Sequence, residues 1–249
     1  MPEIDEIKPY GSEGSKRVQV EKMFDEIAPS YDSLNHILSL GVDRIWRREA
    51  IDYLKQNATI SPREILDVAT GTGDFALLAQ EKLHPDHIVG IDISEGMMSA
   101  GRQKIAKKNC SDCITLQYED CSNMSFSDNH FDAIISSFGL RNFQNLDTCL
   151  REMYRVMKTG GTLVVIDLCA PVSFPMKQLF WCYKKVVMPV MGRLISHNEH
   201  AYTYLPETMD AIPQGEVMAE KFRSAGFEKV RFHRQIFGMS MLYLASKLR

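Results

Sequence analysis

Between residues 64 and 168 the chain alternates short apolar runs with longer stretches whose apolar residues recur at helical spacing. Five of the runs have the length and composition of buried strands: residues 64–69, 87–93, 114–118, 131–136 and 162–168. Helical stretches separate them, the last over 145–158, and Gly160 and Gly161 are expected to close it. Strands that alternate with helices form a parallel sheet covered on both faces, so this region predicts an α/β fold.

The order of elements changes after residue 168. Residues 173–195 are expected to be helical, 217–225 to form a further helix, and 230–236 and 239–245 to form two strands joined by a tight turn. The sequence therefore predicts a Rossmann-like, seven-stranded, mostly parallel sheet with an antiparallel final strand. That finish is typical of S-adenosylmethionine methyltransferases, whereas dinucleotide-binding folds more often end in another parallel unit.

One domain accounts for nearly all of the 249 residues. Residues 1–17 are expected to form a flexible tail and 18–249 a single domain, with an N-terminal helical cap over 18–60 and an inserted lid over 172–212. Apolar residues at helical spacing predict the buried faces of the two cap helices: Val20, Met23, Phe24 and Ile27, then Ile45, Ala50 and Leu54.

Charge and composition argue against several classes of protein. The net charge is −3 and the isoelectric point about 6.2, without the basic excess of a nucleic-acid binder. No apolar run reaches the roughly 18 residues of a membrane span, and the acidic residues 1–14 do not resemble a signal peptide. The six scattered cysteines favour reduced thiols, and Cys110 with Cys113 lacks the second pair of a zinc site, so no metal is expected. These observations favour a cytoplasmic protein.

The first predicted strand leads into a glycine turn, residues 67–74 (DVATGTGD), where Gly71 and Gly73 let backbone approach a ligand. Alone, the turn fits NAD, FAD, S-adenosylmethionine or no ligand at all. Asp67 and Asp74 flank it, and two carboxylates would repel a pyrophosphate but suit the cationic groups of S-adenosylmethionine.

Two further acidic residues lie at the ends of the next strands: Asp92 ends the second and Asp120 follows the third. Asp92 has the spacing of a ribose-binding carboxylate, and Asp120, with Cys121 beside it, is placed to meet the adenine amino group. The alternative is that both aspartates only cap the helices that follow them.

Four segments carry a more specific resemblance. They are residues 31–39 (YDSLNHILS) with Gly41, Arg44 and Trp46, residues 137–142 (SFGLRN), residues 155–161 (RVMKTGG) and residues 201–206 (AYTYLP). With the glycine turn they make the chain resemble the ubiquinone/menaquinone-biosynthesis C-methyltransferases from about residue 18 to 247. Two positions depart from the family pattern: Asp43 replaces a histidine found in many relatives, and Ala69 replaces the first glycine of the turn.

The resemblance implies a class I S-adenosylmethionine-dependent methyltransferase fold. It also implies methylation of a ring carbon of a polyprenylated quinol, demethylmenaquinol to menaquinol, with a polyprenyl benzoquinol of the ubiquinone pathway or another small acceptor as alternatives. Carried over by position, the cofactor contacts fall on a set spread along the chain: Thr72, Asp92, Asp120, Cys121 and Ser137.

Three residues are the candidates for catalysis. Arg141 and Asn142 follow the fourth strand, at the sheet edge where ligands bind, and Arg141 could steady a developing oxyanion or hold a water. Tyr31 could close over the site from the cap. The alternatives are that Arg141 pairs with a surface carboxylate and that Tyr31 packs a helix. His197 and His200 are either catalytic or partly exposed loop residues.

Residues 174–191 mix aromatic residues and methionines with three lysines. They form either a lid helix packed on the core or a lipid-facing helix that shelters the prenyl tail. The second reading predicts weak peripheral contact with a membrane. The ring system, the tail length, the general base and the oligomeric state, with a homodimer as one alternative, stay open at this level.

Overall fold

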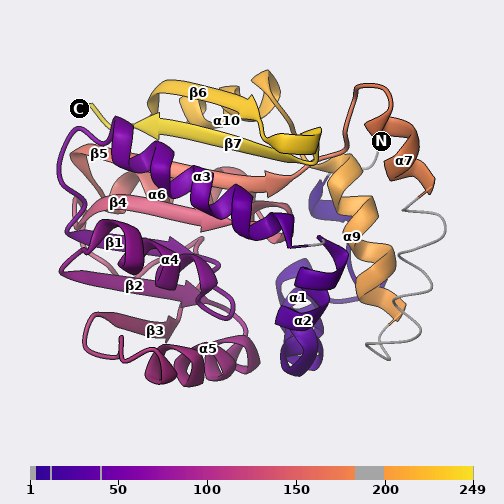
Figure 1. The fold of residues 1–249 in the computed structure, drawn as a ribbon, viewed down its shortest axis with the longest axis horizontal. Coiled ribbons are helices and arrows are strands. Elements are labelled where there is room, and N and C mark those ends of the chain that lie inside the picture. Colours follow the sequence, from indigo (N-terminus) through magenta and orange to yellow (C-terminus); the bar gives the residue numbers. More distant parts are fainter. Residues whose placement is uncertain (1–3, 12, 40, 183–198, 249) are drawn as a thin grey trace.

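A seven-stranded sheet organises the molecule in the computed structural model, which describes residues 4–11, 13–39, 41–182 and 199–248. The strand order is β3-β2-β1-β4-β5-β7-β6 (Figure 1). The strands are β1 Glu64–Val68, β2 His87–Asp92, β3 Ile114–Tyr118, β4 Phe131–Ser137, β5 Met157–Leu168, β6 Glu228–Arg234 and β7 Ser240–Ser246. The pairs from β3 to β5 are parallel, and β7 runs antiparallel to both of its neighbours. The prediction of a mostly parallel sheet with an antiparallel final strand is confirmed.

Helices cover both faces of the sheet (Figure 1). On one face lie α3 (Val42–Asn57), α4 (Asp74–Leu83) and α5 (Glu95–Lys107), and on the other α6 (Leu146–Val156) and α10 (Glu216–Ser224). Successive strand residues point to opposite faces of the sheet. Ile65 therefore packs in the apolar cluster under α3, α4 and α5, and Leu66 packs in the cluster under α6 and α10. Two separate cores result, and the strands between them are apolar on both sides.

The remaining elements gather beyond the carboxyl ends of the parallel strands (Figure 1). They are the short turn η1 Ile4–Glu6, α1 Lys16–Ile27, η2 Ala28–Ser30, α2 Tyr31–Leu38, η3 Leu140–Asn142, α7 Met176–Cys182, α9 Glu199–Ala211 and η6 Ile236–Gly238. Helices α1, α2, α7 and α9 therefore lie at the edge of the sheet where ligands of α/β folds bind, whereas α3, which belongs to the predicted cap, covers a face of the sheet. Part of the helix expected over 173–195 lies outside the described residues.

The N-terminal residues differ from the flexible tail expected through residue 17. Ile7 is buried, and α1 begins at Lys16, whose side chain is 1% exposed. The Lys16 ammonium donates to the carbonyl oxygens of Ile4, at 2.8 Å, and Arg141, at 3.0 Å. A buried cation needs such acceptors, so this side chain ties the start of the chain to the sheet edge.

Two local expectations are wrong. Gly160 and Gly161 do not close a helix: α6 ends at Val156, and β5 already includes both glycines. Ile45 is 53% exposed, because the buried face of α3 passes instead through Trp46 and residues three to four positions apart after it.

Candidate active site

The turn after β1 requires its glycines. Gly71 and Gly73 have φ of 56° and 76°, in the left-handed region that side chains disfavour. Ala69 also has a positive φ, of 57°, so this chain forms the turn with an alanine where the family pattern has glycine, at a cost of about 1 kcal/mol. The turn leads directly into α4, whose N-cap is Gly73.

Asp92, at the end of β2, fastens this turn. Its Oδ2 atom accepts a hydrogen bond from the Gly71 N–H at 2.8 Å, and its Oδ1 atom accepts one from the Ser94 N–H at 2.9 Å. Burial raises the pKa of Asp92, against the opposing effect of these hydrogen bonds. The carboxylate therefore holds the turn and also faces a cavity.

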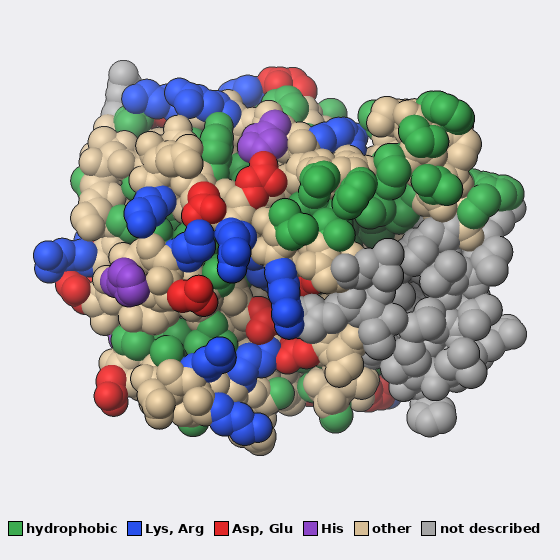
Figure 2. Space-filling view, viewed as in Figure 1, with side chains coloured by type: hydrophobic (Ala, Val, Ile, Leu, Met, Phe, Trp, Pro, Cys, Tyr) green, Lys and Arg blue, Asp and Glu red, His purple; other side chains and the backbone are tan. Residues whose placement is uncertain are grey.

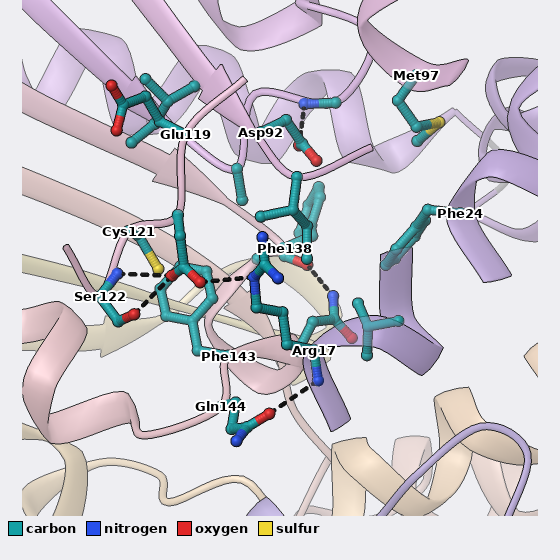
Figure 3. A pocket seen from close by; sticks show the side chains of 18 of the residues that line it. Arg17, Phe24, Asp92, Met97, Glu119, Cys121, Ser122, Phe138, Phe143 and Gln144 are labelled. Carbon is teal, nitrogen blue, oxygen red and sulfur yellow. Dashed lines mark hydrogen bonds and ion pairs between the residues drawn. The ribbon is translucent and has the colours of Figure 1, made fainter. Parts of the chain in front are cut away.

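That cavity, here the first pocket, lies between α1, the glycine turn and the ends of β2, β3 and β4 (Figure 3). Its walls combine carboxylates with apolar side chains. It is lined by Ser15, Arg17, Val20, Phe24, Tyr31, Ala69, Gly71, Ile91, Asp92, Ile93, Met97, Glu119, Asp120, Cys121, Ser122, Ser137, Phe138, Gly139, Asn142, Phe143, Gln144 and Asn145. Seven of the residues proposed for the site from sequence meet here: Tyr31, Gly71, Asp92, Asp120, Cys121, Ser137 and Asn142.

Arg17 extends across the first pocket from α1 (Figure 3). Its Nε atom lies 2.6 Å from Asp120 Oδ2, and its guanidinium donates to the Tyr118 hydroxyl at 2.8 Å. The other oxygen of Asp120 accepts from the backbone and hydroxyl of Ser122. A ligand that uses Asp120 must therefore compete with Arg17.

Cys121 faces α6 as well as the pocket. Its sulfur lies 2.9 Å from that of Cys149, and this hydrogen bond, together with burial, raises the pKa of Cys121 well above the ordinary value of a thiol. The side chain is therefore an uncharged thiol at neutral pH.

Three proposed cofactor contacts do not line the first pocket: Asp67, Thr72 and Gly73. Asp67 is fully buried at the end of β1 and accepts a hydrogen bond from the Thr70 hydroxyl at 2.7 Å. The Thr72 hydroxyl donates to Asp32 Oδ1 at 2.6 Å and so fixes the start of α2, next to Tyr31. Their roles as cofactor contacts stay predictions.

A second pocket adjoins the first, on the side of α3 and the inserted segment. It is lined by Tyr31, Asn35, Ser39, Asp43, Trp46, Arg47, Phe138, Arg141, Leu168, Phe180, Leu205, Met209 and Met239. Tyr31 and Phe138 line both pockets and so stand at their junction. Phe138 has a φ of 61°, and Trp46 packs edge-on against its ring at 6.2 Å while Arg47 lies over it at 5.0 Å. This strained backbone is held by contacts on the ring.

Two buried ion pairs flank the second pocket. Arg141 Nη1 lies 2.6 Å from Asp167 Oδ1 and donates to the Phe138 carbonyl at 2.6 Å. Arg47 Nη1 lies 2.6 Å from Asp43 Oδ2. The alternative in which Arg141 pairs at the surface is wrong, because both side chains of its pair are buried.

Asp167, Asp43 and Arg47 were not among the sequence-based candidates. Asp43 and Arg47 have the i,i+4 spacing of an ordinary surface pair, and the signal that marks them as buried is their position on the same face as Trp46 and Ala50.

Tyr31 lies close enough to Arg141 and Arg47, the cations of the two ion pairs, for their charges to affect its hydroxyl. Burial raises its pKa, and the charges of Arg141 and Arg47 oppose that shift. The phenol is therefore neutral at neutral pH and serves as a hydrogen-bond donor at the junction of the pockets.

The first pocket fits the cofactor expected from sequence. Carboxylates at Asp92 and Asp120 suit hydroxyl and amino groups, and Ile93, Met97 and Phe143 offer apolar surface for a flat ring. No group of three acidic, cysteine or histidine side chains arranged to hold a metal is found in the ranges that the structure describes. His197 lies outside those ranges.

Comparisons with known proteins agree with one another. The model of the ubiE/COQ5 methyltransferase family matches residues 12–247. A demethylmenaquinone methyltransferase of Bacteroides fragilis is 54% identical and covers 98% of each chain. One of Porphyromonas gingivalis is 42% identical and covers 99% of this chain and all of its own.

Solved structures share the fold at low identity. The cyclase SpnF superposes with a TM-score of 0.67 at 18% identity, over 94% of this chain and 97% of its own. An S-adenosylmethionine-dependent methyltransferase of Aquifex aeolicus gives 0.56 at 16% identity, over 80% and 89%. Both show the same Rossmann-like arrangement, which confirms the predicted fold class.

Proposed function

The chain belongs to the ubiE/COQ5 methyltransferase family, and from that premise we propose that it methylates a ring carbon of a prenylated quinol, with demethylmenaquinol as the acceptor and menaquinol as the product. It is an S-adenosylmethionine-dependent methyltransferase. The relatives that match over nearly the whole chain support the naphthoquinol ring in preference to a benzoquinol.

One observation carries the proposal: the two pockets meet at Tyr31 and Phe138. A group transfer needs two reactants held in contact and in line, and orientation of this kind is worth several kcal/mol. The acidic first pocket and the apolar second pocket provide separate places for a polar donor and an aromatic acceptor. Tyr31 and Phe138 line both of these places.

In the first pocket the residues would bind and orient the cofactor. S-adenosylmethionine, when bound, supplies a methyl group on a positively charged sulfur. Asp92 is suited to the ribose hydroxyls, and the Gly71 turn gives backbone access to the same region. Negative charge at Asp92 and Glu119 also favours a cationic ligand.

In the second pocket the residues suit a quinol. Seven apolar side chains enclose a ring, and the Arg141 guanidinium, held by Asp167, can stabilise negative charge on a ring oxygen. A quinol carbon becomes nucleophilic as its neighbouring hydroxyl loses its proton. A quinone ring is electron-poor and would not react.

We also propose that the protein docks weakly on a membrane. Exposed apolar side chains gather over α7 and the adjoining end of the sheet (Figure 2). They form the apolar patch Val172, Phe174, Leu179, Trp181, Ile236 and Phe237. Arg234 holds the two parts of the patch together, because its guanidinium donates to the carbonyls of Ala170 and Gly238.

A membrane contact would let the enzyme reach the ring of a quinol whose prenyl tail stays in the bilayer. Each buried methylene is worth about 0.8 kcal/mol, so a long prenyl tail does not leave the bilayer for water. Among the described residues no helix is long and apolar enough to cross a membrane. Docking of the apolar patch, with Phe180 of the same helix lining the second pocket, would let the ring enter while the tail stays in lipid.

The test is methyl transfer from labelled S-adenosylmethionine to naphthoquinol and benzoquinol acceptors that carry the same tail. We expect transfer to the reduced naphthoquinol, slower transfer to the benzoquinol, and none to either quinone when the reductant is omitted. Equal rates with and without the reductant would refute the proposed chemistry. A faster reaction with the benzoquinol would show that the natural acceptor is a benzoquinol and not a naphthoquinol.

A further inference from the structure

The peptide unit between Arg141 and Asn142 joins the two pockets. Arg141 lines the second pocket and Asn142 lines the first, so the orientation of this one unit sets the directions of two candidate catalytic side chains. Its N–H donates to the Gly139 carbonyl at 2.9 Å, and its carbonyl accepts a hydrogen bond from the Lys16 ammonium at 3.0 Å. Within the described part of the chain, Lys16 is the one donor to that carbonyl.

Lys16 is a buried cation that is held by backbone carbonyls. Its side chain is 1% exposed, and its second acceptor is the Ile4 carbonyl at 2.8 Å. Burial of an ammonium costs free energy that an apolar side chain of the same length would avoid. Packing alone therefore does not account for a charge at this position, whereas support of the Arg141 carbonyl does.

We propose that Lys16 is a positioning residue for the methyl transfer, which holds the Arg141 carbonyl and so keeps Arg141 and Asn142 in place in their two pockets. The inference rests on the proposed function, because it concerns the rate of that reaction. Lys16 is not among the lining residues of either pocket, so it acts through the peptide unit. Charged hydrogen bonds are about twice as strong as neutral ones, so the support depends on the Lys16 proton.

Groups on several elements set the charge of Lys16. Burial lowers the pKa of Lys16 to about 8, while the charge of Asp5 in η1 raises it and that of Arg141 in η3 lowers it. Asp167 of β5 pairs with Arg141, and Tyr204 of α9 is a neutral phenol because burial raises its pKa. The folded protein therefore releases this proton at a lower pH than the unfolded chain does, so this ionisation does not itself favour unfolding.

The experiment measures single-turnover methyl transfer to a short-tailed naphthoquinol at saturating S-adenosylmethionine, from about pH 7 to about pH 9.5. Lys16→Met keeps the length of the side chain and leaves a buried carbonyl without its charged donor, so we expect this variant to be at least about tenfold slower than the wild type at the lower pH. The ratio of wild-type to variant rate should fall to about threefold or less at the higher pH, because the wild type loses its ammonium. Ionisation of the quinol affects both proteins alike and cancels in this ratio.

A second variant shifts the ionisation and leaves Lys16 in place. Asp5→Asn removes the charge that raises the pKa of Lys16, and Asp5 lines neither pocket. Its rate should equal that of the wild type where both proteins hold the proton and where both have lost it. The rate of Asp5→Asn relative to the wild type should therefore pass through a minimum near pH 8. This variant tests the inference even if Lys16→Met does not fold.

Lys247 offers a matched control. It is also a buried lysine, burial lowers its pKa, and its ammonium donates to the Tyr154 carbonyl at 2.8 Å. It follows β7 at the end of the sheet away from the pockets. The ratio of wild-type to Lys247→Met rates should stay constant over the same pH range.

Each outcome is decisive. A ratio of wild-type to Lys16→Met rates that does not change with pH overturns the inference and leaves the proposed function intact. An Asp5→Asn profile that coincides with that of the wild type does the same. A ratio for Lys247→Met that falls as steeply as that for Lys16→Met also overturns it, because the effect would then belong to any buried lysine. A wild-type enzyme that methylates no quinol refutes the proposed function and this inference together.

Discussion

Asp67 is a buried acid whose ionisation opposes folding. It lies beneath the glycine turn with no exposed surface, and burial raises the pKa of its carboxyl to about 7. Between about pH 4 and pH 7 the folded protein keeps a proton that the unfolded chain has lost. The contribution of this group to the free energy of unfolding therefore falls as the pH rises through that window.

Replacement by asparagine tests this reasoning. Asp67→Asn keeps an acceptor for the Thr70 hydroxyl and cannot ionise, so it should stabilise the protein relative to the wild type by a few kcal/mol above pH 7 and by much less near pH 4. Thermal unfolding at the two pH values measures the difference. A gain that is the same at both would show that burial does not penalise the Asp67 charge.

Asp92 should behave differently, because it faces the first pocket. Asp92→Ala removes an acceptor from the pocket, one hydrogen bond from the turn and one from the Ser94 N–H, and should weaken S-adenosylmethionine binding by about 1–3 kcal/mol. Calorimetry is the measurement. Asp74→Ala is the matched control, since Asp74 flanks the same turn, pairs with Lys104 and does not line the first pocket. Equal losses in the two variants would reduce Asp92 to a support of the turn.

At this scale the sequence predicted the acidic residues at the strand ends but not the charges buried behind them. Asp92 ends a strand and Asp120 follows one, and strand ends can be located from apolar runs. Arg141 and Asp167 are 26 positions apart and meet only because β4 and β5 are neighbours. Their pairing is a property of the sheet, which no local pattern contains.

Among the elements, α7 combines two environments in three consecutive residues. Leu179 and Trp181 are 58% and 56% exposed, whereas Phe180 is buried and lines the second pocket. The helix therefore has one apolar side towards the proposed acceptor and another towards solvent, a combination that fits docking on lipid.

The two sides can be separated by mutation. Leu179→Ser with Trp181→Ser should weaken binding to anionic vesicles and slow the reaction of a long-tailed quinol, with little effect on a short-tailed quinol or on thermal stability. Phe180→Ser is the control and should slow both substrates, because it alters the second pocket itself. Vesicle sedimentation measures the membrane binding, and rates with the long-tailed and short-tailed quinols measure the effect on the reaction. If the double variant slowed both substrates equally and lowered the melting temperature, α7 would be ordinary core.

The elements were largely predictable, and their errors have local causes. All seven strands were located from apolar runs, within a few residues at most ends. The start of β5 was misplaced because Gly160 and Gly161 resemble a helix end, whereas Gly161 is needed for close packing: an added Cβ would lie 2.6 Å from Met157 Cγ. A pair of glycines is found both where backbone packs closely and where a helix ends, so the sequence alone does not separate the two.

For the whole molecule, fold and function are separate questions. The cyclase SpnF shares this fold with a TM-score of 0.67, so the arrangement of sheet and helices does not by itself indicate methyl transfer. The function follows from the family and from the two pockets at the sheet edge. Those pockets depend on α1 and α2, which bring Arg17, Phe24 and Tyr31 over the strand ends.

Cofactor binding should therefore protect the backbone of α1 from hydrogen exchange. Hydrogen exchange of the α1 backbone should slow when S-adenosylmethionine is added, because Ser15, Arg17, Val20 and Phe24 line the first pocket. Exchange of β6, at the far edge of the sheet, serves as the internal reference and should change little. Identical α1 exchange with and without the cofactor would contradict a site completed by this helix.

The buried ammonium of Lys16 bears on how the chain assembles during synthesis. Its partner carbonyl belongs to Arg141, which is 125 positions later in the chain. A ribosome adds about 5–20 residues per second, so α1 waits several seconds outside the exit tunnel before that acceptor exists. The ammonium stays hydrated until β4 has joined β1 and η3 has formed. The segment that is made first is thus among the last to be placed, and a nascent chain that ends before residue 141 should leave α1 open to proteolysis.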